Sequence, residues 1–375
     1  MDLLSGLPVH NDHVAGRLAF GPDNKLYLSV GDQGSNFGAN ACNPNRAQET
    51  PSAAEVRNQD WVHYQGKLLR INLDGSVPRD NPVINGVRSH VYTYGHRNIQ
   101  GIAFGAGKTY AAEQGPSTDD EINLMRAGGN YGWPNVAGYR DDRAYVYGNW
   151  PAASNCRSLP FDPDKIPAEV PKQKETEWNH PNFVPPIQTF FTVDDNSRFR
   201  ADGNATAALS GMVYYGSTGI PGWANSLLVT GMRAGTVYRL KLSADGRTIA
   251  GQPENLFRGV NRPRDLAISP DGKKIYMITD VTGRVTLAPG VTRTMHLAGR
   301  SADTKCTRRP ISSNESTMMR RTPTSSAWSS SLVDLLFPCT MIDSPGTPAR
   351  RARSEEHTSE LQSHLNLVCR LLLEK

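Results

Sequence analysis

The chain has 375 residues and a formal net charge of +5, with 34 glycines and 26 prolines. Four of the five net charges fall within residues 286–375, so the first 285 residues are nearly neutral and lack the basic surface of a nucleic-acid-binding protein. The sequence has no run of about 18 apolar residues, which excludes a membrane-spanning helix. The many glycines and prolines favour short strands joined by turns.

The first residues, MDLLSGLPVHNDH, place a histidine beside a carboxylate, His13 next to Asp12. They show no basic segment followed by an apolar one, and therefore no pattern of a signal peptide. An imidazole titrates at about pH 6.5, which makes His13 the best candidate general base, although most single histidines are structural.

A strand–turn–strand pattern recurs along the chain. Each copy has an apolar strand, a glycine-containing turn, and a second apolar strand that ends in an acidic or glycine-rich loop. The copies are GRLAFGPDNKLYLSVGD (16–32), RNIQGIAFGAGKTYAAEQG (97–115) and RPRDLAISPDGKKIYMITD (262–280). Further strands are predicted within 67–75, 121–133 and 226–242.

Repeats of short antiparallel strands are typical of an all-β propeller, with a β-sandwich as the alternative. We count about four blade equivalents. A closed ring usually has more, so we expect an incomplete propeller that lacks blades at its start.

The loops between the predicted strands contain the residues best suited to chemistry. Arg97 lies in GHRNIQG (95–101) and carries a permanent charge with five donors. Asp32 ends the first copy, and further arginines follow in later loops at Arg233, Arg262 and Arg264. Arginines on converging loops would bind a polyanion, above all a planar carboxylated one. The alternative is a set of surface arginines, each paired with a carboxylate.

An acidic run, Asp119 to Glu121, follows the carbonyl groups of Gly115 and Pro116. Hard oxygen ligands of this kind suit calcium. The spacing does not match a calcium-binding loop, so a solvated acidic turn is the alternative.

The two cysteines of the first 285 residues, Cys42 and Cys156, have no metal-binding spacing. They are either free thiols or one disulfide. The sequence also lacks a G-x-S-x-G motif, a zinc motif and a phosphate-binding loop, which disfavours serine hydrolysis, zinc chemistry and nucleotide chemistry.

Residues 286–375 lose the strand-and-turn pattern and become rich in Ser, Thr and Arg. The run RSEEHTSELQSH (353–364) resembles translated sequencing-adapter DNA. We interpret this segment as a non-native, frameshifted tail and place the native domain at residues 1–285. The alternative is a natural disordered tail with a short C-terminal helix.

Several ordered motifs in residues 2–285 resemble the soluble quinoprotein glucose dehydrogenases, which use pyrroloquinoline quinone (PQQ), and the wider glucose/sorbosone dehydrogenase family. Among them are DHxxGRL (12–18), GDQG (31–34), GHRNxQG (95–101), EQGPxxDDEINL (113–124), GGNYGWPNVAGY (128–139) and RxRD (262–265). The resemblance implies a six-bladed, calcium-dependent propeller, of which roughly the first two blades and the closing strand are absent here.

The same resemblance implies PQQ-dependent oxidation of an aldose at C1 to the lactone. It assigns His13 as the general base, Arg97 as the group that polarises the quinone carbonyl, and Asp32 as the residue that orients His13 and substrate. The implied cofactor contacts are Asn98, Arg233, Arg262 and Arg264. The carbonyls of Gly115 and Pro116 would hold the calcium ion that also ligates PQQ. The implied structural calcium ligands are Glu121, Tyr131, Ala137, Tyr139, Asp141 and Glu175.

Two departures from the best-known members leave glucose specificity open: Phe37 stands where they have a sugar-facing glutamine, and the segment after FFTVDDN (190–196) is shorter. A third departure, Arg233 in place of their lysine, preserves the charge but changes its geometry.

The resemblance further implies a periplasmic or secreted homodimer that passes electrons to a quinone, cytochrome or dye. A calcium-dependent propeller lactonase or other hydrolase is the second candidate, and the arginine set argues against it. A non-catalytic, sugar-binding propeller is the third, and the presence of His13, Asp32 and Arg97 argues against it.

Overall fold

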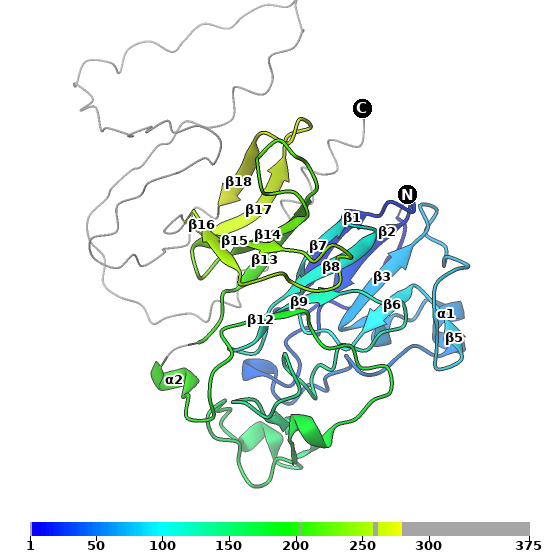
Figure 1. Ribbon diagram of the computed structural model, residues 1–375. Helices are drawn as coiled ribbons and strands as arrows, with labels where there is room; N and C mark the ends of the chain where they lie inside the picture. Colours follow the sequence, from blue (N-terminus) through cyan, green and yellow to red (C-terminus); the bar gives the residue numbers. More distant parts are fainter. Residues whose placement is uncertain (1, 203, 258–261, 280–375) are drawn as a thin grey trace, which may run out of the picture. The chain divides into compact units, whose positions relative to one another are not determined.

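Antiparallel strands make up most of the regular structure in the computed structural model, which describes residues 2–202, 204–257 and 262–279 (Figure 1). The predicted tail at 286–375, with its boundary at 285 and its short helix, lies outside these residues.

Consecutive strands of the chain pair into three four-stranded sheets and a hairpin. The first sheet contains β1 (Ala15–Phe20), β2 (Leu26–Val30), β3 (Lys67–Ile71) and β6 (Val91–Tyr94). The second contains β7 (Ile99–Gly105), β8 (Lys108–Glu113), β9 (Asp120–Leu124) and β12 (Gln188–Phe190). The third contains β13 (Leu209–Tyr215), β14 (Ser226–Gly231), β15 (Thr236–Lys241) and β16 (Glu254–Leu256). The hairpin is β17 (Pro263–Ile268) with β18 (Ile275–Thr279).

Shorter elements fill the connections. Two small hairpins pair β4 (Val83–Ile84) with β5 (Val87–Arg88) and β10 (Tyr147–Gly148) with β11 (Lys172–Gln173). The α-helices are α1 (Ala53–Asn58) and α2 (Phe199–Asp202), and 3-10 turns occur at Gly38–Asn40, Val62–Tyr64, Trp150–Ala152, Cys156–Ser158 and Glu175–Glu177. No helix of the described residues is long and apolar enough to cross a membrane.

All three predicted strand–turn–strand copies are antiparallel hairpins: β1–β2, β7–β8 and β17–β18. The first strands of the successive sheets, β1, β7, β13 and β17, pack against one another in chain order. Side chains bridge these neighbours: Ser29 Oγ donates to the carbonyl of Ile99 at 3.0 Å, and Ser210 Oγ donates to that of Pro263 at 3.2 Å. This succession of sheets is that of propeller blades, so the predicted propeller is confirmed and the sandwich alternative is wrong. The described residues form an incomplete propeller of three full blades and one hairpin.

The hydrophobic core lies between successive blades. On β14, Leu227 and Val229 join an apolar cluster with residues of the second sheet, while Leu228 joins a cluster with Leu266 of β17. Successive side chains of a strand point to opposite faces of its sheet, so a central blade needs apolar residues at consecutive positions. This explains the uninterrupted apolar run in SLLVTG.

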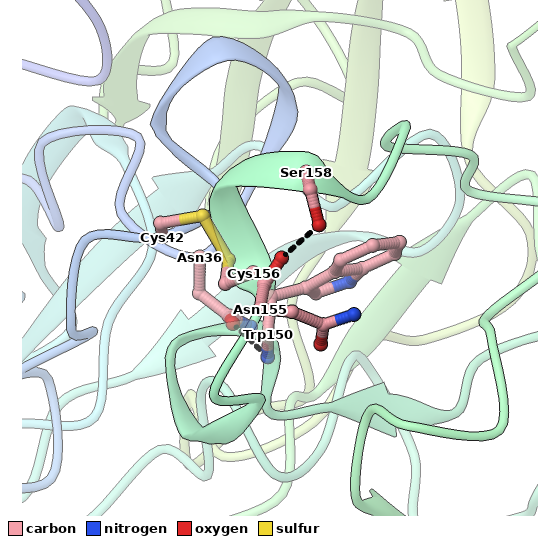
Figure 2. The surroundings of a disulfide bond; sticks show 6 residues. All are labelled: Asn36, Cys42, Trp150, Asn155, Cys156 and Ser158. Carbon is pink, nitrogen blue, oxygen red and sulfur yellow. Dashed lines mark hydrogen bonds between the residues drawn. A yellow bond between two sulfur atoms is a disulfide. The ribbon is translucent and has the colours of Figure 1, made fainter.

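Residues 125–187 connect β9 to β12 as a long excursion with little regular structure. A disulfide between Cys42 and Cys156 joins this excursion to the loop after β2, with the two Cα atoms 5.8 Å apart (Figure 2). The structure therefore resolves the alternative left open by the sequence in favour of the disulfide.

Candidate active site

The strand register brings the predicted site residues to one end of the blades. In each blade, the first residue of the first strand lies opposite the last residue of the second; the pairs are Ala15 with Val30, Ile99 with Glu113, Leu209 with Gly231 and Pro263 with Thr279. Residues just before the first strands and just after the second strands therefore share this end. Those predicted from the sequence are His13, Asp32, Arg97, Asn98, Gly115, Pro116, Arg233 and Arg262. A hydrogen bond of 2.9 Å from the backbone N–H of Asp32 to the carbonyl of Arg97 joins the first two blades here.

His13 and Asp32 form a buried pair. Nδ1 of His13 lies 2.7 Å from Oδ1 of Asp32, and the two residues are 2% and 0% exposed. His13 has a φ of 42°, in the left-handed region, and its carbonyl packs so closely on Gly31 that a Cβ there would lie 1.7 Å away. Only glycine at position 31 leaves space for the backbone of His13.

Further donors orient the carboxylate of Asp32. Its Oδ2 accepts a bond of 2.7 Å from the indole Nε1 of Trp133 and one of 2.9 Å from Nδ2 of Asn45. Its Oδ1 accepts the backbone N–H of Gly34 at 2.9 Å. An ionised carboxylate has only acceptor sites, so this arrangement suits the charged form facing His13.

Arg97 is 2% exposed, so its interpretation as a surface residue is wrong. The guanidinium carbon lies 5.6 Å from the ring centre of Phe37 and 5.5 Å from that of Trp133, within the range of cation–π attraction. One guanidinium nitrogen donates to the carbonyl of Gln114 at 3.2 Å. Trp133 therefore contacts both Asp32 and Arg97.

The carboxylate of Glu113 fixes the loop that carries Arg97. It accepts the backbone N–H groups of Arg97 and Asn98, the second at 3.2 Å, and lies 2.9 Å from Nδ1 of His96. Asn98 is itself bonded through its side chain to Oε1 of Gln114 at 3.3 Å.

The other predicted arginines lie on the third blade and the hairpin. Arg233 occupies the turn between β14 and β15, where its backbone N–H donates to the carbonyl of Ala207 at 3.0 Å. Arg262, which is 5% exposed, directly precedes β17. Arg264 is the second residue of β17, at an irregularity in the register between Pro263 and Asp265.

The acidic run is buried, with Asp119 at 2%, Asp120 at 0% and Glu121 at 8% exposure, so its interpretation as a solvated turn is wrong. Burial raises the pKa of Asp120 to about 6, and burial together with the charge of Glu113 raises that of Glu121 well above its usual value. A cavity of about 10 Å³ beside this run is lined by Arg97, Glu113, Gly115, Pro116, Glu121, Tyr131, Trp133, Ala137 and two neighbours. Five predicted calcium-site residues thus line the same small cavity as the predicted catalytic arginine: Gly115, Pro116, Glu121, Tyr131 and Ala137.

Glu175 organises the other predicted calcium ligands. Its carboxylate accepts the backbone N–H groups of Ala137 at 2.9 Å, Asp142 at 2.9 Å and Asp141 at 3.3 Å, and burial raises its pKa to about 8. Tyr139 is 40% exposed, and the hydroxyl of Tyr131 donates to the carbonyl of Leu124 at 2.7 Å. Across 2–202, 204–257 and 262–279, no three His, Cys, Asp or Glu residues are arranged to hold a metal ion.

A larger cavity of about 280 Å³ adjoins the small one, with Pro116 and Trp133 lining both. We call three residues that line this cavity the aromatic wall: Phe37, Trp150 and Phe161. The ring centre of Phe161 lies 4.9 Å from that of Phe37 and 5.0 Å from that of Trp150.

Sequence reasoning missed the roles of Trp133, Asn45 and Glu113. Trp133 and Glu113 stand inside the motifs GGNYGWPNVAGY and EQGPxxDDEINL, so the motifs contained a signal that residue chemistry alone did not reveal. Asn45 lies outside every motif cited above.

Comparisons with known proteins identify the family of this chain. The family model described as Glucose / Sorbosone dehydrogenase matches residues 3–153 and 192–287. Quinoprotein glucose dehydrogenase B of Acinetobacter calcoaceticus is 47% identical over 313 residues, which cover 80% of this chain and 66% of that protein. A crystal structure from Thermus thermophilus, described as a putative oxidoreductase (glucose dehydrogenase), is 26% identical with a TM-score of 0.50 and covers 77% of this chain and 67% of that one.

A PQQ-bound aldose sugar dehydrogenase from Streptomyces coelicolor is 26% identical with a TM-score of 0.48, covering 76% of this chain and 61% of that one. This chain thus spans between 61% and 67% of the length of these three proteins. The family model matches well over half of the chain, and the chain belongs to the glucose/sorbosone dehydrogenase family.

Proposed function

We propose that this chain carries the active site for PQQ- and calcium-dependent oxidation of an aldose at C1, which yields the lactone. The observation that supports this most strongly is the buried His13–Asp32 pair at the same blade end as Arg97. The relative from Acinetobacter calcoaceticus, named a quinoprotein glucose dehydrogenase, supports the cofactor class and the sugar substrate.

His13 would remove the proton of the C1 hydroxyl. Its Nδ1 is engaged by Asp32, so Nε2 would accept that proton. The carboxylate of Asp32 orients the imidazole and stabilises the imidazolium formed by proton transfer. Arg97 would stabilise negative charge that develops on an oxygen in front of its guanidinium.

The chemistry of the donor set at this blade end fits PQQ, a planar tricarboxylate. Guanidinium groups match carboxylates with two parallel hydrogen bonds, and Arg97, Arg233, Arg262 and Arg264 all belong to this end or its first strand positions. These residues, with Asn98, would hold the cofactor, and bound PQQ would supply the acceptor for the hydride from C1.

The donor set around the small cavity fits calcium. Gly115 and Pro116 supply carbonyl oxygens, and Glu121 supplies a carboxylate whose raised pKa reflects burial beside Glu113. A cation there would favour the charged form of Glu121. Calcium would act as a Lewis acid toward an oxygen ligand.

The test is reduction of an electron-accepting dye by aldoses, with calcium present and with or without PQQ. Turnover that requires PQQ and disappears in His13→Ala supports the proposal. Sugar-lactone hydrolysis that is indifferent to PQQ would instead identify the hydrolase alternative. Sugar binding without either reaction, unchanged in His13→Ala, would identify a binding propeller. In a cell, the proposal predicts an exported homodimer that delivers electrons to a quinone or cytochrome.

A further inference from the structure

The Cys42–Cys156 disulfide joins the two segments that carry the aromatic wall: the loop with Phe37 and the excursion with Trp150 and Phe161. Cys42 follows Phe37 by five residues, and Cys156 precedes Phe161 by five. The rings of Phe37 and Phe161 meet with their centres 4.9 Å apart. The disulfide, shown in Figure 2, and the ring contact therefore both join the loop after β2 to the excursion at 125–187.

Phe37, on the loop after β2, lies beside the candidate active site. The ring centre of Phe37 lies 5.6 Å from the guanidinium carbon of Arg97 and 6.5 Å from the ring centre of His13. A shift of Phe37 would change the wall beside both groups. Its position therefore bears on where a substrate can lie.

Cys156 and Phe161 belong to the excursion at 125–187, which has little regular secondary structure. Within 125–187, the paired strand residues are those of the two-residue strands β10 and β11. Near the disulfide, the side chain of Asn36 makes two hydrogen bonds to the excursion. Its Oδ1 accepts the backbone N–H of Trp150 at 2.9 Å, and its Nδ2 donates to the carbonyl of Gly148 at 2.9 Å. An apolar cluster of Ala41, Trp150, Ala153, Cys156 and Val170 packs around it. Around the disulfide, the backbone hydrogen bonds are mostly those of local turns, such as the N–H of Ala153 to the carbonyl of Trp150 at 3.1 Å and the N–H of Cys156 to that of Ala153 at 3.0 Å. Segments held by local turns open more easily than blade strands.

We propose that the Cys42–Cys156 disulfide is a redox-sensitive clamp that positions the aromatic wall against the Arg97 loop. A dithiol would open it in a two-electron exchange: the sulfur–sulfur bond breaks, both cysteines become thiols, and the dithiol becomes a disulfide. Opening the clamp frees residues 149–170 of the excursion to move away from Phe37 while the blades stay folded. Trp133 keeps its place, because its backbone N–H donates to the carbonyl of Gly95 at 3.0 Å and its indole donates to Asp32. The sugar then binds more weakly, a consequence that rests on the proposed function. The proposed cofactor residues Asn98, Arg233, Arg262 and Arg264 lie outside the clamp and keep their places.

The first experiment tests the clamp without using activity. The full chain is treated with dithiothreitol until two additional thiols titrate, and acrylamide quenching of fluorescence is compared between the wild type and Trp150→Phe. The difference isolates Trp150, which is 3% exposed in the oxidised protein. We expect its quenching constant to rise at least about threefold on reduction. The double variant Cys42→Ala, Cys156→Ala should show the raised constant already and should not respond to dithiothreitol.

The second experiment measures turnover in the same samples. Reduction should raise KM for the aldose about threefold or more and leave kcat within about twofold, because the wall binds substrate but does not react. Two titrated thiols with Trp150 still shielded would overturn the clamp, as would loss of the cooperative melt on reduction. If no sample turns over sugar, the proposed function fails, and the quenching comparison still decides whether the clamp exists.

Discussion

Nδ1 of His13 lies 2.7 Å from Oδ1 of Asp32, and the indole Nε1 of Trp133 donates to the other oxygen of that carboxylate at 2.7 Å. Asp32 and Trp133 are separated by 101 residues in the chain. The proposed base His13, Asp32 and Trp133 are thus joined in one buried network.

His13→Gln should reduce kcat for aldose oxidation by about 100-fold or more, because a positioned general base contributes at least that much. The amide keeps part of the hydrogen bonding but cannot take up a proton. Dye reduction at saturating sugar and PQQ measures the effect. His10→Gln, which alters an exposed histidine three residues earlier, should leave kcat unchanged. Equal kcat in the wild type and His13→Gln would remove His13 from the reaction.

Trp133→Phe should lower kcat about tenfold while KM changes little. The substitution removes the 2.7 Å indole bond to Asp32 but keeps an aromatic ring near Arg97. A hydrogen bond to a charged group is worth roughly 1.5–3 kcal/mol, part of which is expressed in the orientation of His13. Trp178→Phe, at a tryptophan that stacks on His180, is the control. A change in KM alone would assign Trp133 to sugar binding.

Arg97→Lys should weaken PQQ binding about tenfold, because lysine retains the charge but loses the planar donor pair and the stacking on Phe37 and Trp133. The increase in melting temperature with PQQ concentration measures the affinity without activity. Arg239→Lys is a matched control, since that guanidinium stacks on Trp223 at 5.5 Å outside the candidate site. Unchanged PQQ affinity in Arg97→Lys would contradict the assignment.

Calcium should raise the melting temperature, and chelation should lower it. The effect should be lost in Glu121→Gln, because calcium prefers charged oxygen ligands. Glu169→Gln, at an exposed glutamate, should retain the full calcium response. Magnesium should replace calcium poorly, since it demands a tighter octahedral shell. A calcium response equal in both variants would place the ion elsewhere.

Lys67 should make stability depend on pH above neutrality. Its ammonium nitrogen is buried and donates to the carbonyls of Ala47 at 2.9 Å, Arg46 at 3.1 Å and Gln65 at 2.5 Å. Burial lowers its pKa to about 7, from an ordinary value of 10.5. Between those pH values the unfolded chain binds more protons than the folded one, so the contribution of Lys67 to stability increases as the pH rises.

Lys67→Met removes this dependence together with the ammonium bonds to the three carbonyls. The carbonyls of Arg46 and Ala47 keep one backbone donor each, from Glu49 at 3.1 Å and Gly95 at 3.0 Å. Relative to Lys67→Met, the wild type should therefore gain free energy of unfolding between pH 7 and about pH 9.5, as measured by urea denaturation. A difference between the two proteins that is constant across this range would contradict the lowered pKa of Lys67. The same substitution should also loosen Asn45, whose loop Lys67 anchors through Arg46 and Ala47.

The hairpins and the blade fold could be predicted from local pattern. A turn such as SPDGK reverses the chain within a few residues, and the flanking apolar strands must then pair. The hairpin β17–β18 is therefore determined by residues close together in the sequence. The motif around Arg97 likewise predicts a cationic loop from neighbouring residues alone. These features depend on residues close together in the sequence.

The tertiary structure decided the features that depend on distant residues. The acidic run Asp119 to Glu121 could be solvated or buried on sequence grounds. In the structure it is buried, and distant residues bond to it: the N–H of Gly138 donates to Glu121, and the hydroxyl of Thr206 donates to Asp120. Cys42 and Cys156 pair across 114 residues because the excursion folds back on the loop after β2. Trp133 reaches Asp32 for the same reason. By itself, the sequence determined the strands, the turns and the chemical groups; only the convergence of loops at one end of the blades decided which groups touch, because contacts between distant residues follow from packing rather than from local backbone preference.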